Sequence, residues 1–183
     1  MHMNIPNALS LFRLMLIPVM VILFYLPIEH SAALTGSVFF IAGFTDLLDG
    51  YLARKLKQSS AFGAFIDPVA DKVLVSTSLI LIVEYYNSAW ITIPAVVMIS
   101  REIIISALRE WMAEEGKRDA VAVSWLGKIK TAAQMLAILL FLIQPSGVLL
   151  YIAYIALTVA SVLTIWSMCS YLFQAQKELL KDM

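Results

Sequence analysis

Four aspartates fall in two close pairs within 26 consecutive residues. Asp46 and Asp49 are three residues apart, and Asp67 and Asp71 are four apart. If both stretches are helical, each pair lies on one face of its helix. Four neighbouring carboxylates repel one another and need cations between them. An all-oxygen set of this kind suits Mg²⁺, Mn²⁺ or Ca²⁺ rather than Zn²⁺, and two such ions would balance the four charges. Two-metal sites serve phosphoryl chemistry, so the pattern predicts a site of that class.

Small residues accompany both pairs. Gly50 and Ala53 each lie one turn beyond an aspartate of the first pair, and Gly63 lies one turn before the second pair. Their missing or short side chains leave room for a flat or bulky group, such as a nucleotide, to approach the backbone. Small residues also permit tight packing between helices, and this is the interpretation that we prefer for Gly36 and Gly43.

The elements that carry these residues are membrane helices. The 183 residues are 61% hydrophobic and 14% charged, whereas soluble domains carry about 45–50% apolar and about 25% charged residues. At roughly 20 residues per span, the length allows five to seven spans and excludes a second sizeable soluble domain. Basic and acidic residues number 13 each, which gives no basic excess for nucleic acid. A lone cysteine, Cys169, excludes an internal disulfide and a Cys-based zinc site.

Six spans are predicted, in one domain covering residues 1–183. Their approximate bounds are 5–27, 31–54, 63–86, 90–114, 124–143 and 148–172. Lys and Arg gather at the second and fourth connections and on the tail, and the first, third and fifth connections contain neither. Cytoplasmic loops collect such residues, so both termini and the even-numbered connections are expected in the cytoplasm. We therefore predict an all-α, six-helix transmembrane bundle.

Several spans reach membrane length only by including charged residues. The uncharged run of the second span, for example, ends before Asp46, and that of the third begins after Lys72. A charged side chain deep in a bilayer costs at least about 2.5–3.5 kcal/mol and normally faces a protein interior or a wet cavity. Asp46 is eight residues inside Arg54, and Asp71 is eight inside Gly63. At about 1.5 Å per residue, both lie on the order of 12 Å from the cytoplasmic helix ends. The hairpin between the two spans thus brings four carboxylates to a similar depth.

The whole string from 46 to 71 resembles a family signature. It reads Asp-x₂-Asp-Gly-x₂-Ala-Arg-x₈-Gly-x₃-Asp-x₃-Asp, and it is similar to the signature of the CDP-alcohol phosphatidyltransferases. Further stretches resemble members of that family that use glycerol 3-phosphate, and the resemblance covers nearly the whole chain. These stretches are Asn4 to Asn7, Arg101 to Arg109 and Gly127 to Thr131.

The resemblance implies a membrane enzyme, commonly a homodimer, of the inner (cytoplasmic) membrane of a bacterium, with its site open to the cytoplasm. It would join CDP-diacylglycerol to sn-glycerol 3-phosphate, giving phosphatidylglycerophosphate and CMP. The four aspartates would bind two Mg²⁺ ions, with Mn²⁺ as a substitute, and Asp71 would be the general base. The residues implied to line the CDP pocket are Gly50, Ala53, Arg54 and Gly63.

The phosphate group of a phosphorylated acceptor needs cationic side chains to bind it, in addition to the metal ions. The candidates are Arg101, Arg109, Lys128 and Lys130. Arginine favours bidentate phosphate binding, and lysine adds a point charge. The basic residues also have ordinary interpretations: Lys130 could equally be a positive-inside anchor, and Glu102 or Glu110 could pair with an arginine.

Other functions remain open at the level of sequence. Serine or inositol 1-phosphate could replace glycerol 3-phosphate as the acceptor, and the basic residues favour a phosphorylated acceptor over serine. From a different class, acidic pairs in membranes also mark divalent-cation or proton-coupled transporters. The acids cluster near one surface without a visible inverted repeat, which disfavours a transporter. A catalytically silent assembly protein is the third alternative, but it has no need for all four acids.

Overall fold

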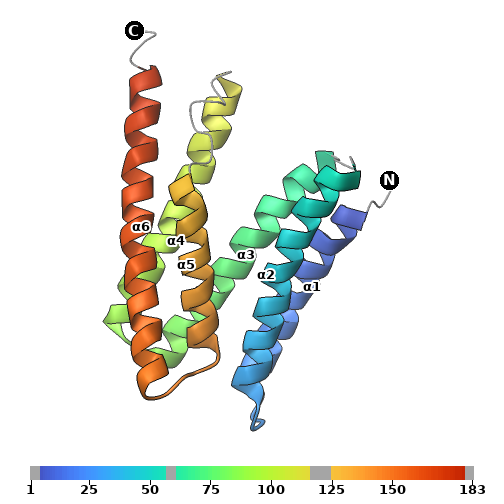
Figure 1. Ribbon diagram of the computed structural model, residues 1–183, viewed down its shortest axis with the longest axis vertical. Coiled ribbons are helices and arrows are strands. Elements are labelled where there is room, and N and C mark those ends of the chain that lie inside the picture. Colours follow the sequence, from blue (N-terminus) through green and yellow to red (C-terminus); the bar gives the residue numbers. More distant parts are fainter. Residues whose placement is uncertain (1–4, 57–60, 116–124, 180–183) are drawn as a thin grey trace. The chain divides into compact units, whose positions relative to one another are not determined.

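The described part of the chain forms six helices (Figure 1). The computed structural model describes residues 5–56, 61–115 and 125–179, with side chains described at 7–48, 55, 62–63, 65–115 and 129–176. The helices are α1 (Ile5–Tyr25), α2 (Ser31–Leu56), α3 (Ala61–Tyr86), α4 (Ala89–Glu114), α5 (Trp125–Leu142) and α6 (Val148–Leu179). The predicted all-α fold and its number of helices are therefore confirmed.

The helix ends agree with the sequence, except at the C-terminus. The predicted sixth span stops at residue 172, whereas α6 continues to Leu179. The segment after 172 contains no glycine or proline, so nothing in it interrupts the helix. Asn87 follows α3 with a φ of 42°, and Gln144 and Gly147 turn the chain between α5 and α6 with φ values of 51° and 58°. Residues of this left-handed conformation commonly terminate helices.

Four helices are long and apolar enough to cross a membrane, judged by length and composition within the described residues. Their spanning segments are Asn7–Tyr25, Ser31–Leu48, Ala89–Glu114 and Val148–Gln176. The α3 helix has the length, but it carries Asp67, Asp71 and Lys72 in its first half. The described apolar part of α5 is the shorter segment Ile129–Leu142. The protein is thus a membrane protein, and the crossing of α3 and α5 stays a prediction.

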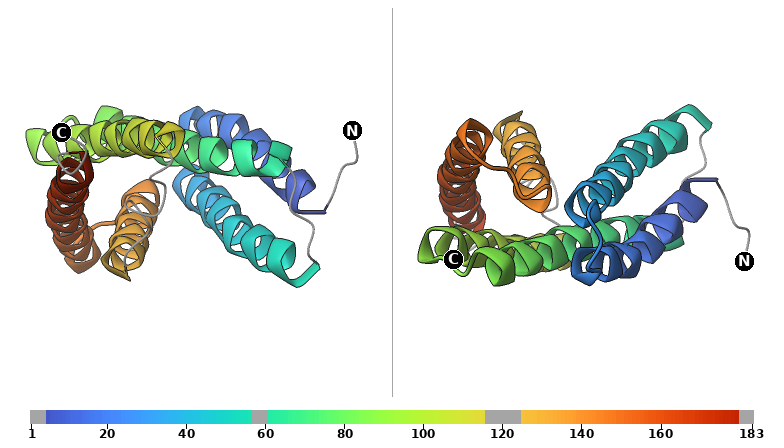
Figure 2. Two further views of the ribbon diagram at one scale, coloured as in Figure 1. Left: turned by 90° about the horizontal axis from the view of Figure 1, so that it is seen from above. Right: turned by 90° about the horizontal axis from the view of Figure 1, so that it is seen from below.

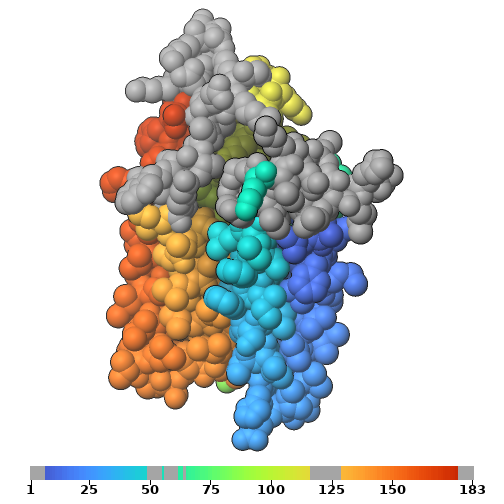
Figure 3. Space-filling view, turned by 45° about the vertical axis from the view of Figure 1, so that its right-hand side comes forward, coloured from blue at the N-terminus to red at the C-terminus, as the bar shows by residue number. Residues whose placement is uncertain are grey.

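The described chain divides into two compact units. The first contains residues 1–85 and 138–150, and the second contains residues 86–137 and 151–183. In the first unit, α1 lies alongside α2 (Figures 1 and 2), and Figure 3 shows their side chains in contact. The side chains of Met20, Phe39 and Leu74 bring α1, α2 and α3 into its apolar core. In the second unit, Ile105 and Met112 of α4 pack with Tyr171 and Ala175 of α6.

Large apolar side chains also cover the outer surfaces of the helices. Met15, Trp90 and Phe173 are at least 70% exposed in the protein alone. Hydrocarbon tails replace water around a spanning helix, so such side chains are the natural lipid-facing surface. Polar side chains are instead found inside both units, with Arg13, Ser78 and Lys130 at most 2% exposed. In soluble proteins charged side chains usually face water. Here these buried charged side chains lie where the helices meet.

Gly36 provides the close packing expected of a small residue. A Cβ atom at this position would lie 2.5 Å from Cγ2 of Ile143. That methyl group sits on a stiff β-branched side chain, so it cannot move aside cheaply. The packing interpretation is therefore confirmed for Gly36.

We expect Gly36→Leu to lower the free energy of unfolding by about 1–3 kcal/mol, because the added side chain overpacks this contact. Thermal or denaturant unfolding of the purified protein in detergent would measure the loss. Ala33→Leu, one turn earlier on an exposed part of α2, is the matched control and should be tolerated. Equal stability of the two variants would contradict the packing role.

Candidate functional site

The first aspartate of the motif is held by a buried arginine. Asp46 of α2 forms an ion pair with Arg13 of α1, with 2.7 Å between Oδ1 and Nη1. The Arg13 side chain has no exposed surface, while that of Asp46 is 43% exposed. A guanidinium so completely buried needs an anionic partner, because the loss of its hydration costs several kcal/mol. The pair therefore fixes one face of the Asp46 carboxylate against α1.

The second aspartate pair is tied to the same helix. The hydroxyl of Ser10, which is fully buried, donates a hydrogen bond to Oδ1 of Asp67 on α3. Ser10 and Arg13 are three residues apart in α1, so they lie on one helix face. Carboxylates from α2 and α3 consequently meet neighbouring positions of α1. This juxtaposition agrees with the prediction that the two halves of the motif come together.

Both contacts involve only one oxygen of each carboxylate. Arg13 and Ser10 each bind Oδ1, so Oδ2 is the atom of Asp46 and of Asp67 that is left for a cation. Asp71 lies one turn beyond Asp67 on α3, and its side chain is half-buried. Among the side chains that the structure describes, no group of three or more His, Cys, Asp or Glu residues is placed to hold a metal ion. Asp49 lies outside that set, so the metal-binding quartet stays a prediction.

The predicted CDP-binding residues are only partly within the description. Gly63 is buried in the first turn of α3. Gly50, Ala53 and Arg54 belong to α2, but their side chains lie outside the described residues. Their assignment to a nucleotide pocket stays a prediction.

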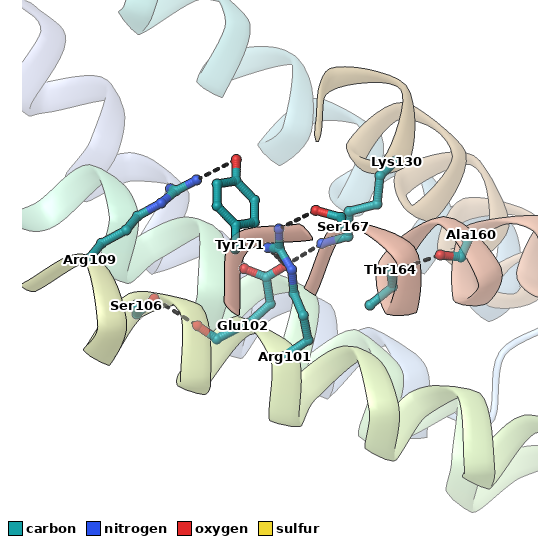
Figure 4. Close-up of polar contacts among 9 residues, drawn as sticks. All are labelled: Arg101, Glu102, Ser106, Arg109, Lys130, Ala160, Thr164, Ser167 and Tyr171. Carbon is teal, nitrogen blue, oxygen red and sulfur yellow. Dashed lines mark hydrogen bonds and ion pairs between the residues drawn. The ribbon is translucent and has the colours of Figure 1, made fainter. Parts of the chain in front are cut away.

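A second polar cluster joins three helices of the other unit (Figure 4). Glu102 of α4 accepts hydrogen bonds through one carboxylate oxygen, from Nη1 of Arg101 at 3.1 Å and from Nζ of Lys130 on α5 at 2.5 Å. Nη2 of Arg101 donates to the hydroxyl of Ser167 on α6, at 3.1 Å. Arg101 and Lys130 are 7% and 2% exposed. The contacts thus gather charged groups inside the unit rather than on its surface.

Arg109 belongs to the same cluster through Tyr171 of α6 (Figure 4). Nη2 of Arg109 donates a hydrogen bond to the Tyr171 hydroxyl at 3.2 Å, and the guanidinium carbon lies 5.2 Å from the centroid of the ring. The guanidinium carbon of Arg101 lies 5.7 Å from that centroid. A tyrosine ring attracts cations through its negative face. One aromatic ring therefore interacts with both arginines.

Among the described side chains, the cluster contains more cationic groups than carboxylates. Three cationic side chains, Arg101, Arg109 and Lys130, are joined by these contacts to a single carboxylate, Glu102. The Nε atoms of both arginines are buried and make no hydrogen bond within the described part of the chain. Buried donors without partners cost free energy that an anion would recover. The arrangement is suited to a phosphate group.

These contacts bear on two of the interpretations left open by the sequence. Glu102 does pair with Arg101, as one alternative held. Lys130 is buried and bound to Glu102, and its alternative interpretation as a positive-inside anchor stays open. Lys128 belongs to α5, but its side chain lies outside the described residues and its phosphate-binding role stays a prediction.

The sequence analysis did not identify four residues that organise the two clusters: Ser10, Arg13, Ser167 and Tyr171. Arg13 could have been found by the rule applied to the aspartates, because it is a charged residue within an apolar span. Serine and tyrosine are ordinary residues of membrane helices, so the sequence carries no comparable signal for the other three. Only the placement of α1 beside the motif and of α6 beside α4 identifies them.

Comparison with known proteins agrees with this chemistry. The sequence profile of a family described as CDP-alcohol phosphatidyltransferase matches residues 3–166. Relatives named CDP-diacylglycerol–glycerol-3-phosphate 3-phosphatidyltransferase match along almost their whole length. The protein of Haemophilus influenzae is 59% identical over 182 residues, covering 100% of this chain and 98% of its own. Those of Pectobacterium atrosepticum and Escherichia coli are 55% and 54% identical, covering 99% and 98% of this chain and 100% and 99% of their own.

We expect Asp46→Asn to lower the free energy of unfolding by about 2 kcal/mol, because it leaves the buried Arg13 charge without its counterion. Adding Arg13→Gln to that variant should recover much of the loss, since both charges are then gone. Denaturant unfolding in detergent would measure both effects. Glu29→Gln, at an exposed carboxylate between α1 and α2, should change little. A double variant less stable than Asp46→Asn would contradict the pairing.

Proposed function

The chain belongs to the CDP-alcohol phosphatidyltransferase family, and on this basis we propose that it transfers the phosphatidyl group of CDP-diacylglycerol to sn-glycerol 3-phosphate. The products are phosphatidylglycerophosphate and CMP. The observation that carries the proposal is the identity of 54–59%, over nearly full length, to relatives named for this reaction. The surplus of buried cations in the α4–α6 cluster supports a phosphorylated acceptor independently of those names.

The motif acids fit divalent cations. Asp46 and Asp67 each keep Oδ2 available while Oδ1 is bound by α1, and carboxylate oxygens are the ligands that Mg²⁺ and Mn²⁺ prefer. In this proposal Asp46, Asp49, Asp67 and Asp71 hold two Mg²⁺ ions, which Mn²⁺ can replace. Bound there, such ions stabilise charge on the attacking and leaving oxygens of phosphoryl transfer.

Asp71 acts as the general base. The acceptor hydroxyl has a pKa far above neutrality, so it needs a positioned carboxylate to take its proton as it attacks. The oxygen forms a bond to the β-phosphorus of the pyrophosphate, and the bond from that phosphorus to the bridging oxygen breaks. The electron pair leaves with CMP, and the proton passes to Asp71. Gly50, Ala53, Arg54 and Gly63 line the pocket of the CDP group.

The acceptor phosphate binds the cationic cluster of the second unit. Arg101 and Arg109 present guanidinium donors that match phosphate oxygens in pairs, and Lys128 and Lys130 add positive charge. Glu102 keeps Arg101 and Lys130 in place while leaving the cluster positive. Serine carries no phosphate and would leave this surplus without a counterion. Inositol 1-phosphate carries a phosphate that would balance these positive charges. The names of the relatives favour glycerol 3-phosphate.

A membrane location suits the donor substrate. Extraction of a diacyl lipid into water costs about 0.8 kcal/mol per exposed CH₂ group, so an enzyme embedded among the tails avoids that cost. We place the protein in the inner membrane of a bacterium, as a homodimer, with both termini and the active site on the cytoplasmic side. The distribution of Lys and Arg among the connections supports this orientation.

A divalent-cation transporter is the alternative from another class. It would also use intramembrane carboxylates, but it has no use for a phosphate-binding cluster. Release of CMP separates the two functions, because a transporter would move metal ions across vesicles and produce none.

We expect Asp71→Asn to lower kcat at least about 100-fold, since it removes the proton acceptor and a metal ligand. CMP release from CDP-diacylglycerol and sn-glycerol 3-phosphate measures this effect. Chelation of divalent ions should stop the wild-type reaction, and added Mg²⁺ should restore it. Glu84→Gln, near the other end of α3, is the matched carboxylate control. Full turnover by Asp71→Asn, or after thorough chelation, would refute the proposed chemistry.

Arg109→Ala tests the acceptor site. We expect it to raise the KM for sn-glycerol 3-phosphate at least about tenfold, because a charge-assisted hydrogen bond to phosphate is lost. The KM for CDP-diacylglycerol and the Mg²⁺ dependence should be largely kept. Steady-state kinetics with each substrate varied in turn provides the measurement. If all three properties deteriorate together, Arg109 has a structural role instead.

A further inference from the structure

Tyr171 occupies a central position in the cationic cluster, although it carries no charge (Figure 4). Its side chain is 4% exposed, and its ring interacts with the guanidinium groups of Arg101 and Arg109 at 5.7 and 5.2 Å from the centroid. Its hydroxyl also accepts a hydrogen bond from Arg109. A single aromatic side chain therefore contacts both arginines.

The two arginines need such an organiser. They are eight residues apart on α4, which corresponds to about 12 Å along a helix axis. Long flexible side chains lose roughly 2 kcal/mol of rotamer freedom when they are fixed, and two like charges repel one another when brought to one place. A buried aromatic ring offsets part of both costs through cation–π attraction. The ring can hold both guanidinium groups before a ligand anion binds.

Tyr171 is itself fixed by its surroundings. It packs in the apolar cluster with Ile105 and Met112 of α4 and Ala175 of α6. One turn before it on α6, Ser167 accepts a hydrogen bond from Arg101 at 3.1 Å. Two positions on one face of α6 thus bind the two arginines of α4. An uncharged helix face therefore helps to orient both arginines, together with the contact of Arg101 to Glu102.

We propose that Tyr171 is a positioning residue that preorganises Arg101 and Arg109 as an anion site and thereby favours acceptors that carry a phosphate. This inference rests on the proposed function for the identity of the acceptor. It assigns no contact between Tyr171 and substrate. Its effect passes through the arginines, so it falls on binding of the phosphorylated acceptor and leaves the donor lipid unaffected.

Binding of sn-glycerol 3-phosphate tests this role without turnover. Isothermal titration of the purified protein in detergent, with Mg²⁺ and without CDP-diacylglycerol, gives the Kd. Tyr171→Phe keeps the ring in the apolar cluster and removes only the hydroxyl, and we expect it to raise the Kd about five- to tenfold. Tyr171→Leu also removes the ring, and we expect an increase of about 100-fold. The KM for the acceptor should rise in parallel, with the KM for CDP-diacylglycerol unchanged.

Two comparisons separate positioning from simple packing. In the Arg109→Ala background, Tyr171→Phe should raise the Kd less than it does in the wild-type protein, because the contact between the hydroxyl and Arg109 is already absent. Tyr151→Phe, at a position of α6 that is 72% exposed, should leave the Kd unchanged. A Kd unaltered in both Tyr171 variants, or an equal rise in Kd when Tyr171→Phe is added to Arg109→Ala, would overturn the proposal.

The result also distinguishes this inference from the proposed function. If the wild-type protein binds sn-glycerol 3-phosphate but forms no phosphatidylglycerophosphate, the proposed function is wrong, and the positioning role is judged on the ratio of Kd values. If the wild-type protein does not bind sn-glycerol 3-phosphate, the anion site is wrong and the role of Tyr171 is overturned with it.

Discussion

A cation enclosed by membrane helices must be matched by an anion, because neither lipid nor apolar side chains can replace its hydration. Both units of this protein obey the constraint. In the first unit, the fully buried guanidinium of Arg13 binds Asp46, and in the second unit, Glu102 binds both Arg101 and Lys130.

In neither unit do the numbers of cationic and anionic side chains in these contacts match one to one. The contacts of α1 gather two carboxylates, Asp46 and Asp67, around one guanidinium and a hydroxyl. Those of α4 gather two cations, Arg101 and Lys130, around one carboxylate, and Tyr171 links Arg109 to Arg101. The residual charges have opposite signs, negative among the motif acids and positive in the α4–α6 cluster, and each calls for a ligand of the opposite sign.

The charged residues of the motif weaken the helices as membrane spans. The α3 helix is as long as α4, yet it is not among the segments that qualify by length and composition, and it contains Asp67, Asp71, Lys72 and Glu84. Insertion of such a helix depends on partners that shelter its charges. Ser10 provides one of these contacts from α1, and tight packing at Gly36 brings α2 against Ile143 in the same unit. Packing and polar pairing between helices therefore stabilise spans whose apolar stretches are shortened by the charged residues of the motif.

Residues that carry no charge determine how the charged ones are presented. Ser10 binds one oxygen of Asp67 and thereby orients that carboxylate. Ser167 and Tyr171, one turn apart on α6, hold the arginines of α4 in a comparable way. Such supporting contacts restrict the geometry of the groups that bind ligand, and their loss weakens binding without removing any ligand group. Polar residues of this kind are common in membrane helices, so their importance follows from position rather than from type.

The sequence by itself determined the six helices, the acids of the motif and the family. Apolar runs of membrane length are long enough to be read reliably, and turn residues such as Asn87 and Gly147 mark where they end. The geometry of a single helix is enough to place Asp67 and Asp71 on one face, so their spacing can be interpreted without the tertiary structure. What only the tertiary structure decided is which charges meet. Arg13 lies more than 30 residues before Asp46, and Arg101 lies 66 residues before Ser167. Such distant pairs depend on how whole helices pack, and the hydropathy of a membrane helix does not specify which of its faces meets which neighbour, because lipid and protein interiors are similarly apolar.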